Sequence, residues 1–154
     1  MEQLKRIIGL VVGVFCTLVV AWICSYCFKM DLNWFVMLNK PSFLVPNGWF
    51  TVFVSVSYIS TILAVSRLVE HKHLFPSLLF FLILGICSIF FVWCFFALKQ
   101  LVAALVFITA VLAMAYVLLV RFLMKDFKMA LEFLPAFIFY LYGFLCVLSI
   151  ALNN

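Results

Sequence analysis

The sequence predicts an all-α membrane protein: a five-transmembrane-helix bundle that forms a single domain over residues 1–154. Three observations predict this class. Hydrophobic residues make up 70% of the chain and charged residues only 10%, whereas soluble domains are nearer half apolar and a quarter charged. The apolar residues form long runs, and a spanning helix needs roughly 20 of them in succession. These runs do not alternate every second residue, as the strands of a membrane barrel would.

The first two spans flank the longest polar segment of the chain. Span one is expected at about 7–28, and it is interpreted as a retained helix because its apolar run is longer than the core of a signal peptide. Segment 29–48 contains Pro41 and Pro46, which are expected to forbid a regular helix there. Span two is expected at about 49–69.

Short polar turns separate the last three spans. Pro76 opens span three, because a proline at the first helical position removes no helical hydrogen bond. This span is expected to reach Leu98, and Lys99-Gln100 then forms a tight turn. Span four is expected to end near Leu123, and span five to cover 129–152 after the loop at 125–128.

The basic residues predict the orientation of the bundle. With five spans, the side of the N-terminus and of the second and fourth loops carries seven of them, namely Lys5, Arg6, Arg67, Lys72, Arg121, Lys125 and Lys128. The other side carries three, which are Lys29, Lys40 and Lys99. Because cytoplasmic loops are enriched in Lys and Arg, we expect a cytoplasmic N-terminus. The basic residues that give the net charge of +5 lie between apolar spans, where they are explained by orientation in the membrane. No nucleic-acid partner is therefore expected.

Candidates for metal binding or ion transport are weak. Cys24 and Cys27 have the spacing of half a zinc site, but no second pair completes it. His71 and His73 are better explained as part of a solvated loop. No acidic or basic residue sits at the centre of a span, which argues against an ion-coupled pump. We expect no metal site, no cofactor and no catalytic residue.

Two polar or aromatic groups remain open to more than one interpretation. Ser57, Ser60 and Thr61 surround Tyr58, and they either line a cavity or bond back to their own helix. Tryptophans at a membrane interface usually form a belt. Two tryptophans flanking a proline-bearing loop also fit a rigid aromatic lid, in which Trp34, Phe43 and Trp49 shield a pocket in the bundle.

The first loop resembles a family signature. The motif W-Y-x2-L-x-K-P-x-F-x-P-P-x-W-x-F of the TspO/MBR family, the tryptophan-rich sensory or translocator proteins, is similar to Trp34-Phe35-x2-Leu38-x-Lys40-Pro41-Ser42-Phe43-x2-Pro46-x2-Trp49-Phe50. Tyr58 stands at the Tyr of the family segment W-T-x-L-Y. Phe95-Phe96 resembles the end of W-S-P-L-F-F, which places Phe91 at its Trp and Ser88 at its Asn. Segment 135–143 is similar to P-Y-L-x-W-x-x-F-A, with Phe139, Tyr142 and Gly143 at its Trp, Phe and Ala.

The departures from the family pattern concern tryptophans. Val45 replaces the first Pro of the usual Pro-Pro pair, Val54 stands where the second-helix Trp is expected, and Phe139 replaces the fifth-helix Trp. The family associates those two tryptophans with porphyrin chemistry. Trp93 lies two residues from the third-helix position, an offset of about 200° that turns it away from a pocket. The chain therefore resembles a divergent member that keeps ligand binding and loses degradation.

The resemblance implies a membrane binding or sensory protein with a pocket beneath the first loop. Family ligands are tetrapyrroles such as protoporphyrin, sterols and flat drug-like aromatics, and a porphyrin-like ligand is expected here. The implied ligand-binding residues are Trp34, Pro41, Phe43, Pro46, Trp49, Tyr58, Ser88, Phe91, Phe139, Tyr142 and Gly143. A tryptophan-dependent porphyrin-degrading enzyme and a small transporter or transporter subunit are the alternatives. Expected partners are the lipid bilayer, the hydrophobic ligand and a second copy in a homodimer. The sequence is expected to contain no strong small-x-x-x-small seam, so the dimer interface stays open.

Overall fold

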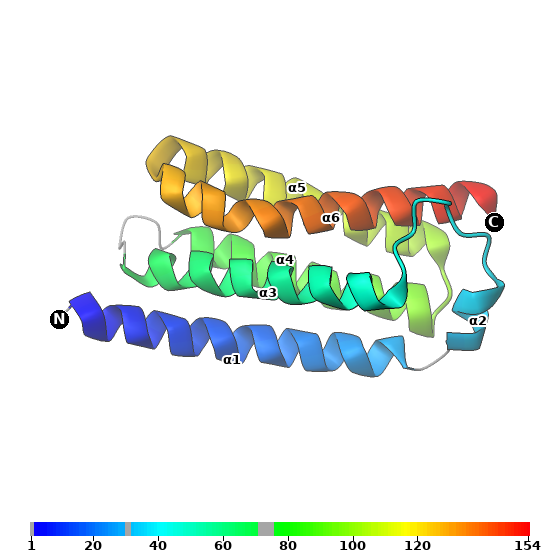
Figure 1. Cartoon of the computed structure of the whole chain (residues 1–154), viewed down its shortest axis with the longest axis horizontal. Helices are drawn as coiled ribbons and strands as arrows, with labels where there is room; N and C mark the ends of the chain where they lie inside the picture. Colours follow the sequence, from blue (N-terminus) through cyan, green and yellow to red (C-terminus); the bar gives the residue numbers. More distant parts are fainter. Residues whose placement is uncertain (1, 30–31, 71–75) are drawn as a thin grey trace.

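The computed structural model describes residues 2–29, 32–70 and 76–154, and this part of the chain is almost entirely helical (Figure 1). Its elements are α1 (Glu2–Phe28), α2 (Leu32–Met37), α3 (Asn47–Glu70), α4 (Pro76–Val92), the π-helical turn η2 (Trp93–Ala97), α5 (Leu101–Lys125) and α6 (Phe127–Asn153). Five segments are long and apolar enough to cross a membrane: Gln3–Phe28, Asn47–Val69, Pro76–Ala97, Leu101–Lys125 and Phe127–Asn153. The predicted all-α bundle of five spans is confirmed.

The five long helices form a closed ring. Helix α1 packs on α3, α3 on α6, α6 on α5 and α5 on α4, and α4 returns to α1. In Figure 1, α3 and α6 lie in front of α4 and α5, and α1 runs along the lower edge. The two termini lie at opposite ends of the bundle, as an odd number of spans requires.

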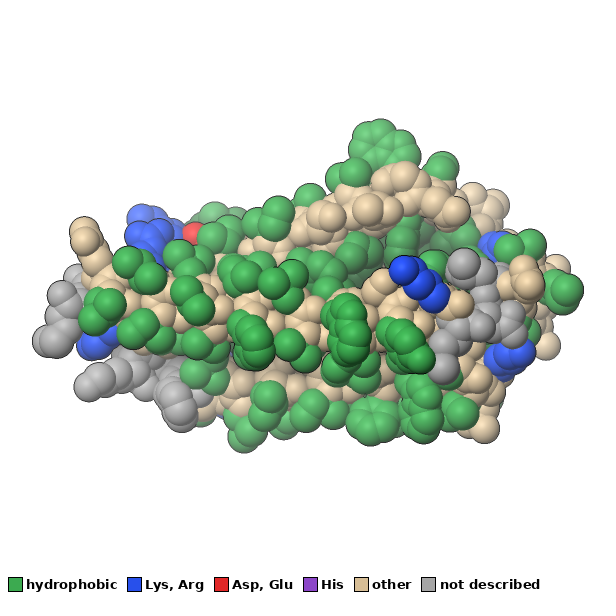
Figure 2. Space-filling model, turned by 90° about the horizontal axis from the view of Figure 1, so that it is seen from below, with side chains coloured by type: hydrophobic (Ala, Val, Ile, Leu, Met, Phe, Trp, Pro, Cys, Tyr) green, Lys and Arg blue, Asp and Glu red, His purple; other side chains and the backbone are tan. Residues whose placement is uncertain are grey.

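Apolar side chains both fill the ring and cover its outside. Inside, the Phe81 ring lies 6.1 Å from the Phe122 ring and 5.5 Å from the Phe133 ring, and Phe122 and Phe133 are fully buried. Outside, Figure 2 shows apolar side chains along nearly the whole length of one face, with Lys and Arg side chains towards its two ends. An apolar band between two polar ends is the surface that a bilayer accommodates.

Two glycines bring α1 and α3 into close contact. A Cβ atom added at Gly9 would lie 2.9 Å from the Ser66 carbonyl oxygen and 3.0 Å from the Val69 Cβ atom. At Gly13, the nearest atom to such a Cβ would be the Ile62 carbonyl oxygen, at 3.4 Å. Glycines four residues apart let helix backbones approach in this way. The expectation of no strong small-x-x-x-small seam is therefore wrong, although this seam joins two helices of one chain.

The third span ends in a π-helical turn. The Leu98 N–H group donates to the Trp93 carbonyl at 3.1 Å, five residues back, instead of four. The wider turn brings three consecutive side chains into the core, namely Cys94, Phe95 and Phe96. Trp93 stays 42% exposed, which agrees with the predicted turn of this tryptophan away from the interior.

The first loop contains a helix that the prolines were expected to forbid. That expectation is wrong for 32–37, because Pro41 and Pro46 both follow this stretch and leave its N–H groups free to form α2. The rings of Trp34 and Phe35 on α2 lie 5.4 and 6.1 Å from the ring of Phe95. Helix α2 is thus anchored on the inward-facing side chains of the π-turn. The predicted loop with His71 and His73 lies outside the described residues.

Candidate functional site

The first loop is fastened across one end of the bundle by α6. The Val45 backbone N–H donates to the Tyr142 hydroxyl oxygen at 2.9 Å, and that hydroxyl donates to the Phe43 carbonyl at 3.4 Å. Further along α6, the Asn39 N–H donates to Asn154 Oδ1 at 2.9 Å, and Asn154 Nδ2 donates to the Asn39 carbonyl at 3.1 Å. The loop is therefore tied to the C-terminal part of the chain at two separate points.

An aromatic row runs between α3 and α6 below this loop. The Phe50 and Phe139 rings are 6.1 Å apart, and the Phe53 and Tyr142 rings are 6.4 Å apart. Phe139 also lies 6.0 Å from Tyr140, the next residue of α6. We refer to Phe50, Phe53, Phe139, Tyr140 and Tyr142 as the α3–α6 aromatic row. Two of the predicted ligand-binding residues, Phe139 and Tyr142, belong to it.

Hydroxyl groups gather where the aromatic row meets the middle of the bundle. The Tyr140 side chain interacts with the hydroxyls of Thr61 and Ser57, and the predicted site residue Tyr58 interacts electrostatically with Tyr140 and Cys24. Ser57 is buried, and Thr61 Oγ1 also donates to the Ser57 carbonyl at 2.9 Å. Thr61 thus bonds back to its own helix, one of the two interpretations of this cluster, and also interacts with the side chain of Tyr140.

A second aromatic group lies beneath α2. Trp34 packs at 5.4 Å and Phe91 at 6.0 Å from the ring of Phe95, which is buried. Ser88, which lies with Phe91 on α4, is also a predicted site residue, and its hydroxyl donates to the Leu84 carbonyl at 2.8 Å. Its hydroxyl is therefore bound to its own helix, the usual arrangement of serine in a membrane helix.

The other predicted residues shape the loop or face outward. Pro41 and Pro46 accept the N–H groups of Leu44 and Phe50, each at 3.1 Å, so they form the turn and the start of α3. Trp49 is 62% exposed, a position typical of an interfacial belt. Phe43 is also exposed.

Gly143 faces the neighbouring helix α5. A Cβ atom added there would lie 3.8 Å from Ile108 Cδ1, which is an ordinary packing distance. The predicted site residues are therefore distributed over the α3–α6 aromatic row, the aromatic group beneath α2, the loop and one helix seam, and the structure does not bring all of them together.

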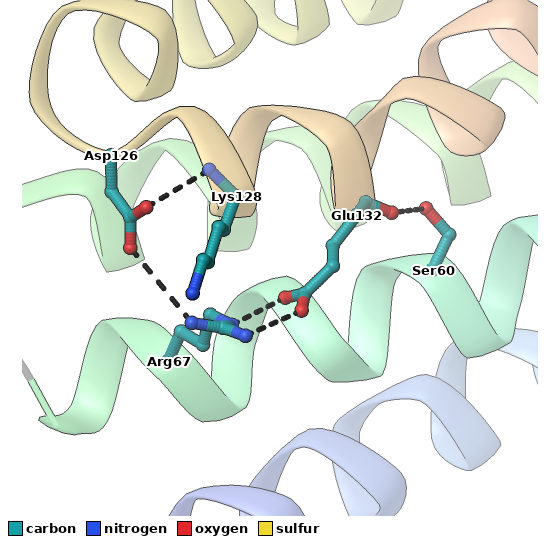
Figure 3. Close-up of polar contacts among 5 residues, drawn as sticks. All are labelled: Ser60, Arg67, Asp126, Lys128 and Glu132. Atoms are coloured by element: carbon teal, nitrogen blue, oxygen red, sulfur yellow. Dashed lines mark hydrogen bonds and ion pairs between the residues drawn. The ribbon is translucent and has the colours of Figure 1, made fainter.

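An ionic clasp between α3 and α6 was missed by sequence reasoning (Figure 3). Arg67 binds the Glu132 carboxylate with both arms of its guanidinium, Nε–Oε2 at 2.6 Å and Nη2–Oε1 at 2.7 Å. Its Nη1 atom lies 3.9 Å from Asp126 Oδ2. The signal for it is an acidic residue inside the predicted fifth span, near the end that lies on the same side of the membrane as Arg67. We refer to Arg67, Asp126 and Glu132 as the clasp.

A serine extends the same contact into the backbone of α6. The Ser60 hydroxyl donates to the Glu132 carbonyl and accepts the Ala136 N–H at 3.3 Å. Residues 132 and 136 are the partners of one i→i−4 helical hydrogen bond. The preceding residue, Pro135, has no N–H to donate. Ser60 therefore supports α6 at the turn where its own hydrogen bonding is interrupted.

Residues that bind metals do not gather in the described chain. No group of three or more His, Cys, Asp or Glu side chains among residues 2–29, 32–70 and 76–154 is arranged to hold a metal ion. The cysteines are all free thiols, and Cys27, Cys94 and Cys146 are buried. The polar chemistry of the described bundle consists of hydroxyls, amides and the clasp.

A family model described as the TspO/MBR family matches residues 7–152. The match runs from the first turns of α1 almost to the end of α6, so it includes every span and the whole first loop. No curated protein matches the chain.

Proposed function

Because this chain belongs to the TspO/MBR family, we propose that it is a membrane-embedded binding or sensory protein for a flat hydrophobic ligand of the tetrapyrrole class. The observation that carries the proposal is the α3–α6 aromatic row beneath a fastened loop. Phe139 and Tyr142 contact Phe50 and Phe53 across the helix boundary, so aromatic faces from both helices are available to one ligand. Aromatic faces bind a planar conjugated ring by offset stacking.

The hydroxyls at the deep end of the row support the same ligand class. Small-molecule sites are mostly apolar, with a few polar groups that fix the orientation of the ligand. Tyr58, Tyr140 and Thr61 offer such groups beside Phe139. A porphyrin has this combination of a flat apolar ring and a small number of polar substituents.

The positions of the tryptophans favour binding over degradation. Trp22, Trp49 and Trp93 are 73%, 62% and 42% exposed, and Trp34 packs on Phe95 on the other side of the interior. The row itself consists of phenylalanine and tyrosine, and phenylalanine is far harder to oxidise than an indole. A reaction that runs through tryptophan radicals therefore has no indole in the row to use.

A porphyrin titration tests the binding half of the proposal. Purified protein should saturate with protoporphyrin, followed by the change in porphyrin absorbance. Phe139→Ala should weaken binding about 2- to 13-fold, because one aromatic contact is worth about 0.5–1.5 kcal/mol. Trp22→Ala removes an exposed aromatic residue of α1 that belongs to no proposed ligand site, and should leave the affinity unchanged. Absence of saturable binding, or equal losses in the two variants, would contradict the proposal.

Illumination tests the second half of the proposal, that the protein does not degrade the bound porphyrin. Protoporphyrin absorbance should decay at the same rate with and without the protein. Rapid bleaching that depends on the protein would instead support the alternative, a porphyrin-degrading enzyme. Repeating the binding titration with haem and with a sterol in place of protoporphyrin separates the tetrapyrrole class from a general preference for flat apolar molecules.

A further inference from the structure

Two adjoining grooves lie on the outside of the bundle, between the first loop and the end of α6. One has a volume of about 480 Å³, and its lining includes Asn39, Lys40 and Ser42. The other has a volume of about 410 Å³, and its lining includes Leu145, Leu148 and Leu152. Both grooves are lined by Phe43, Ser149 and Asn153, so they are the two halves of one site. We refer to this site as the outer groove.

The two halves differ sharply in chemistry. One half presents an ammonium group, amides and hydroxyls from the loop. The other presents leucines that recur every three or four residues along α6, a spacing that places them on one face of the helix. Leu145 and Leu152 are 46% and 77% exposed, so they face away from the interior of the ring. The outer groove is therefore amphipathic and separate from the α3–α6 aromatic row.

The polar half favours an anion. The Lys40 Nζ atom lies 4.7 Å from the centre of the Phe35 ring, and Lys40 has no acidic partner within residues 2–29, 32–70 and 76–154. The acidic side chains of Asp126 and Glu132 are held in the clasp at the opposite end of the bundle. At the loop end, the other cations of the described chain are Lys29 and Lys99.

The walls of the outer groove are held in place. Tyr142 fixes Val45 and the Phe43 carbonyl, and Asn154 fixes Asn39, so the loop wall is tied to α6 on both sides of Lys40. A site with pre-organised walls binds its ligand with less loss of conformational entropy. The groove also lies where α6 ends, so its apolar half is at the depth of acyl chains and its polar half is at the depth of headgroups.

We propose that the outer groove binds one phospholipid with an anionic headgroup. The phosphate contacts Lys40 and Ser42, and an acyl chain lies along Leu152, Leu148 and Leu145. Phe43, at the junction, packs against the glycerol end of that chain. The lipid is a component of the surrounding bilayer, and it occupies a position distinct from the ligand of the bundle interior.

Native mass spectrometry of the full chain in mild detergent tests this proposal. The protein is mixed with phosphatidylglycerol or phosphatidylcholine of identical acyl chains. We expect one phosphatidylglycerol to be retained in preference to phosphatidylcholine. Lys40→Gln should reduce that retention about fivefold, since one basic residue contributes about 1 kcal/mol to binding an anionic lipid. Lys40→Arg, which keeps the charge, should retain it.

Two further variants make the result specific to the groove. Lys29→Gln removes the same charge at the same end of the bundle, outside the groove, and should not change lipid retention. Ser149→Phe fills the junction of the two halves and should abolish retention, with helix content and elution volume unchanged. Equal retention of the two lipids, equal effects of Lys40→Gln and Lys29→Gln, or full retention by Ser149→Phe would overturn the proposal. A dimer that Ser149→Phe disrupts while the lipid stays bound would also overturn it, by assigning the groove to a second copy.

Discussion

At the scale of single residues, the clasp concentrates ionic contacts at one end of a very apolar molecule. Arg67 and Glu132 are about a quarter exposed, and their bidentate geometry is the strong form of an ion pair between side chains. Neither group is at mid-span, so each can keep part of its hydration. The pair links α3 to α6, and its two residues are 65 positions apart in the chain.

Removing one partner of the clasp should destabilise the protein more than removing both. Glu132→Gln leaves the Arg67 charge without its main partner, and we expect a loss of about 1–2 kcal/mol, discounted from the value of a fully buried pair because of partial exposure. The double variant Arg67→Gln with Glu132→Gln should recover part of that loss. Thermal unfolding in detergent gives the coupling from the double-mutant cycle. Strictly additive effects would show that the two side chains do not interact.

The Ser60 hydroxyl should matter more than its size suggests. Ser60→Ala leaves the Ala136 N–H and the Glu132 carbonyl without this partner in a buried position, and we expect a loss of about 1 kcal/mol in a membrane helix. Ser55→Ala is the matched control, because that exposed hydroxyl bonds only to the Thr51 carbonyl of its own helix. Equal melting temperatures for the two variants would argue against a role of Ser60 in joining α3 to α6.

Single residues also show what a sequence can predict. The outward position of Trp93 follows from helical geometry alone, and the structure agrees. The partner of Glu132 does not follow, because it depends on which helices are neighbours in the ring. Placing Phe91 with Trp34, and Phe139 with Phe50, likewise required the packing order α1, α3, α6, α5, α4.

At the scale of elements, α1 is held by its glycines. Its narrow seam with α3 brings backbone against backbone, and most of its other large side chains face outward. The number and order of spans could be predicted because a run of apolar residues is a local property. Helix α2 and the π-turn could not be predicted in this way. Helix α2 depends on the positions of the prolines that follow it, and the π-turn depends on the burial of Phe95 and Phe96 together.

Adding one methyl group to the seam should separate α1 from α3. Gly9→Ala places a Cβ atom 2.9 Å from a carbonyl oxygen of Ser66, and backbone cannot move aside, so we expect a loss of about 1–3 kcal/mol. Gly13→Ala, with 3.4 Å to its nearest neighbour, should cost less.

Gly48→Ala provides the control for the glycine series. Nothing lies within 4 Å of a Cβ atom at this position, and alanine is the better helix former, so stability should be unchanged or slightly higher. Thermal unfolding of the three variants measures their order of stability, which should be Gly48→Ala above Gly13→Ala above Gly9→Ala. If Gly9→Ala unfolds at the temperature of Gly48→Ala, the seam is looser than its geometry indicates.

At the scale of the whole molecule, charge is distributed asymmetrically between the two ends of the bundle. The clasp, the start of α1 and the end of α3 share one end, and the first loop and Lys99 share the other. The ring uses its glycine seam internally, so that seam is not available to a second copy. A homodimer would need another face.

The distribution of basic residues predicts a cytoplasmic N-terminus. Seven basic residues on one side against three on the other should orient the chain during insertion. A fluorescent reporter that folds only in the cytoplasm should be active at the N-terminus and inactive at the C-terminus, and an exported phosphatase reporter should give the opposite result. Two termini reporting the same side would contradict a chain of five spans.

The fastened first loop has a consequence for the supply of the proposed porphyrin ligand to the aromatic row. With Val45 tied to Tyr142, and Asn39 to Asn154, the aqueous end of the bundle is covered, whereas Phe50 and Phe53 are 39% and 42% exposed on the flank of the ring. The bilayer is then the reservoir, and the search for the site is two-dimensional. Occupancy depends on the number of porphyrin molecules per lipid and not per litre of water. Adding lipid should therefore lower the occupancy of the proposed site, even when the total concentrations of porphyrin and protein in the sample stay the same.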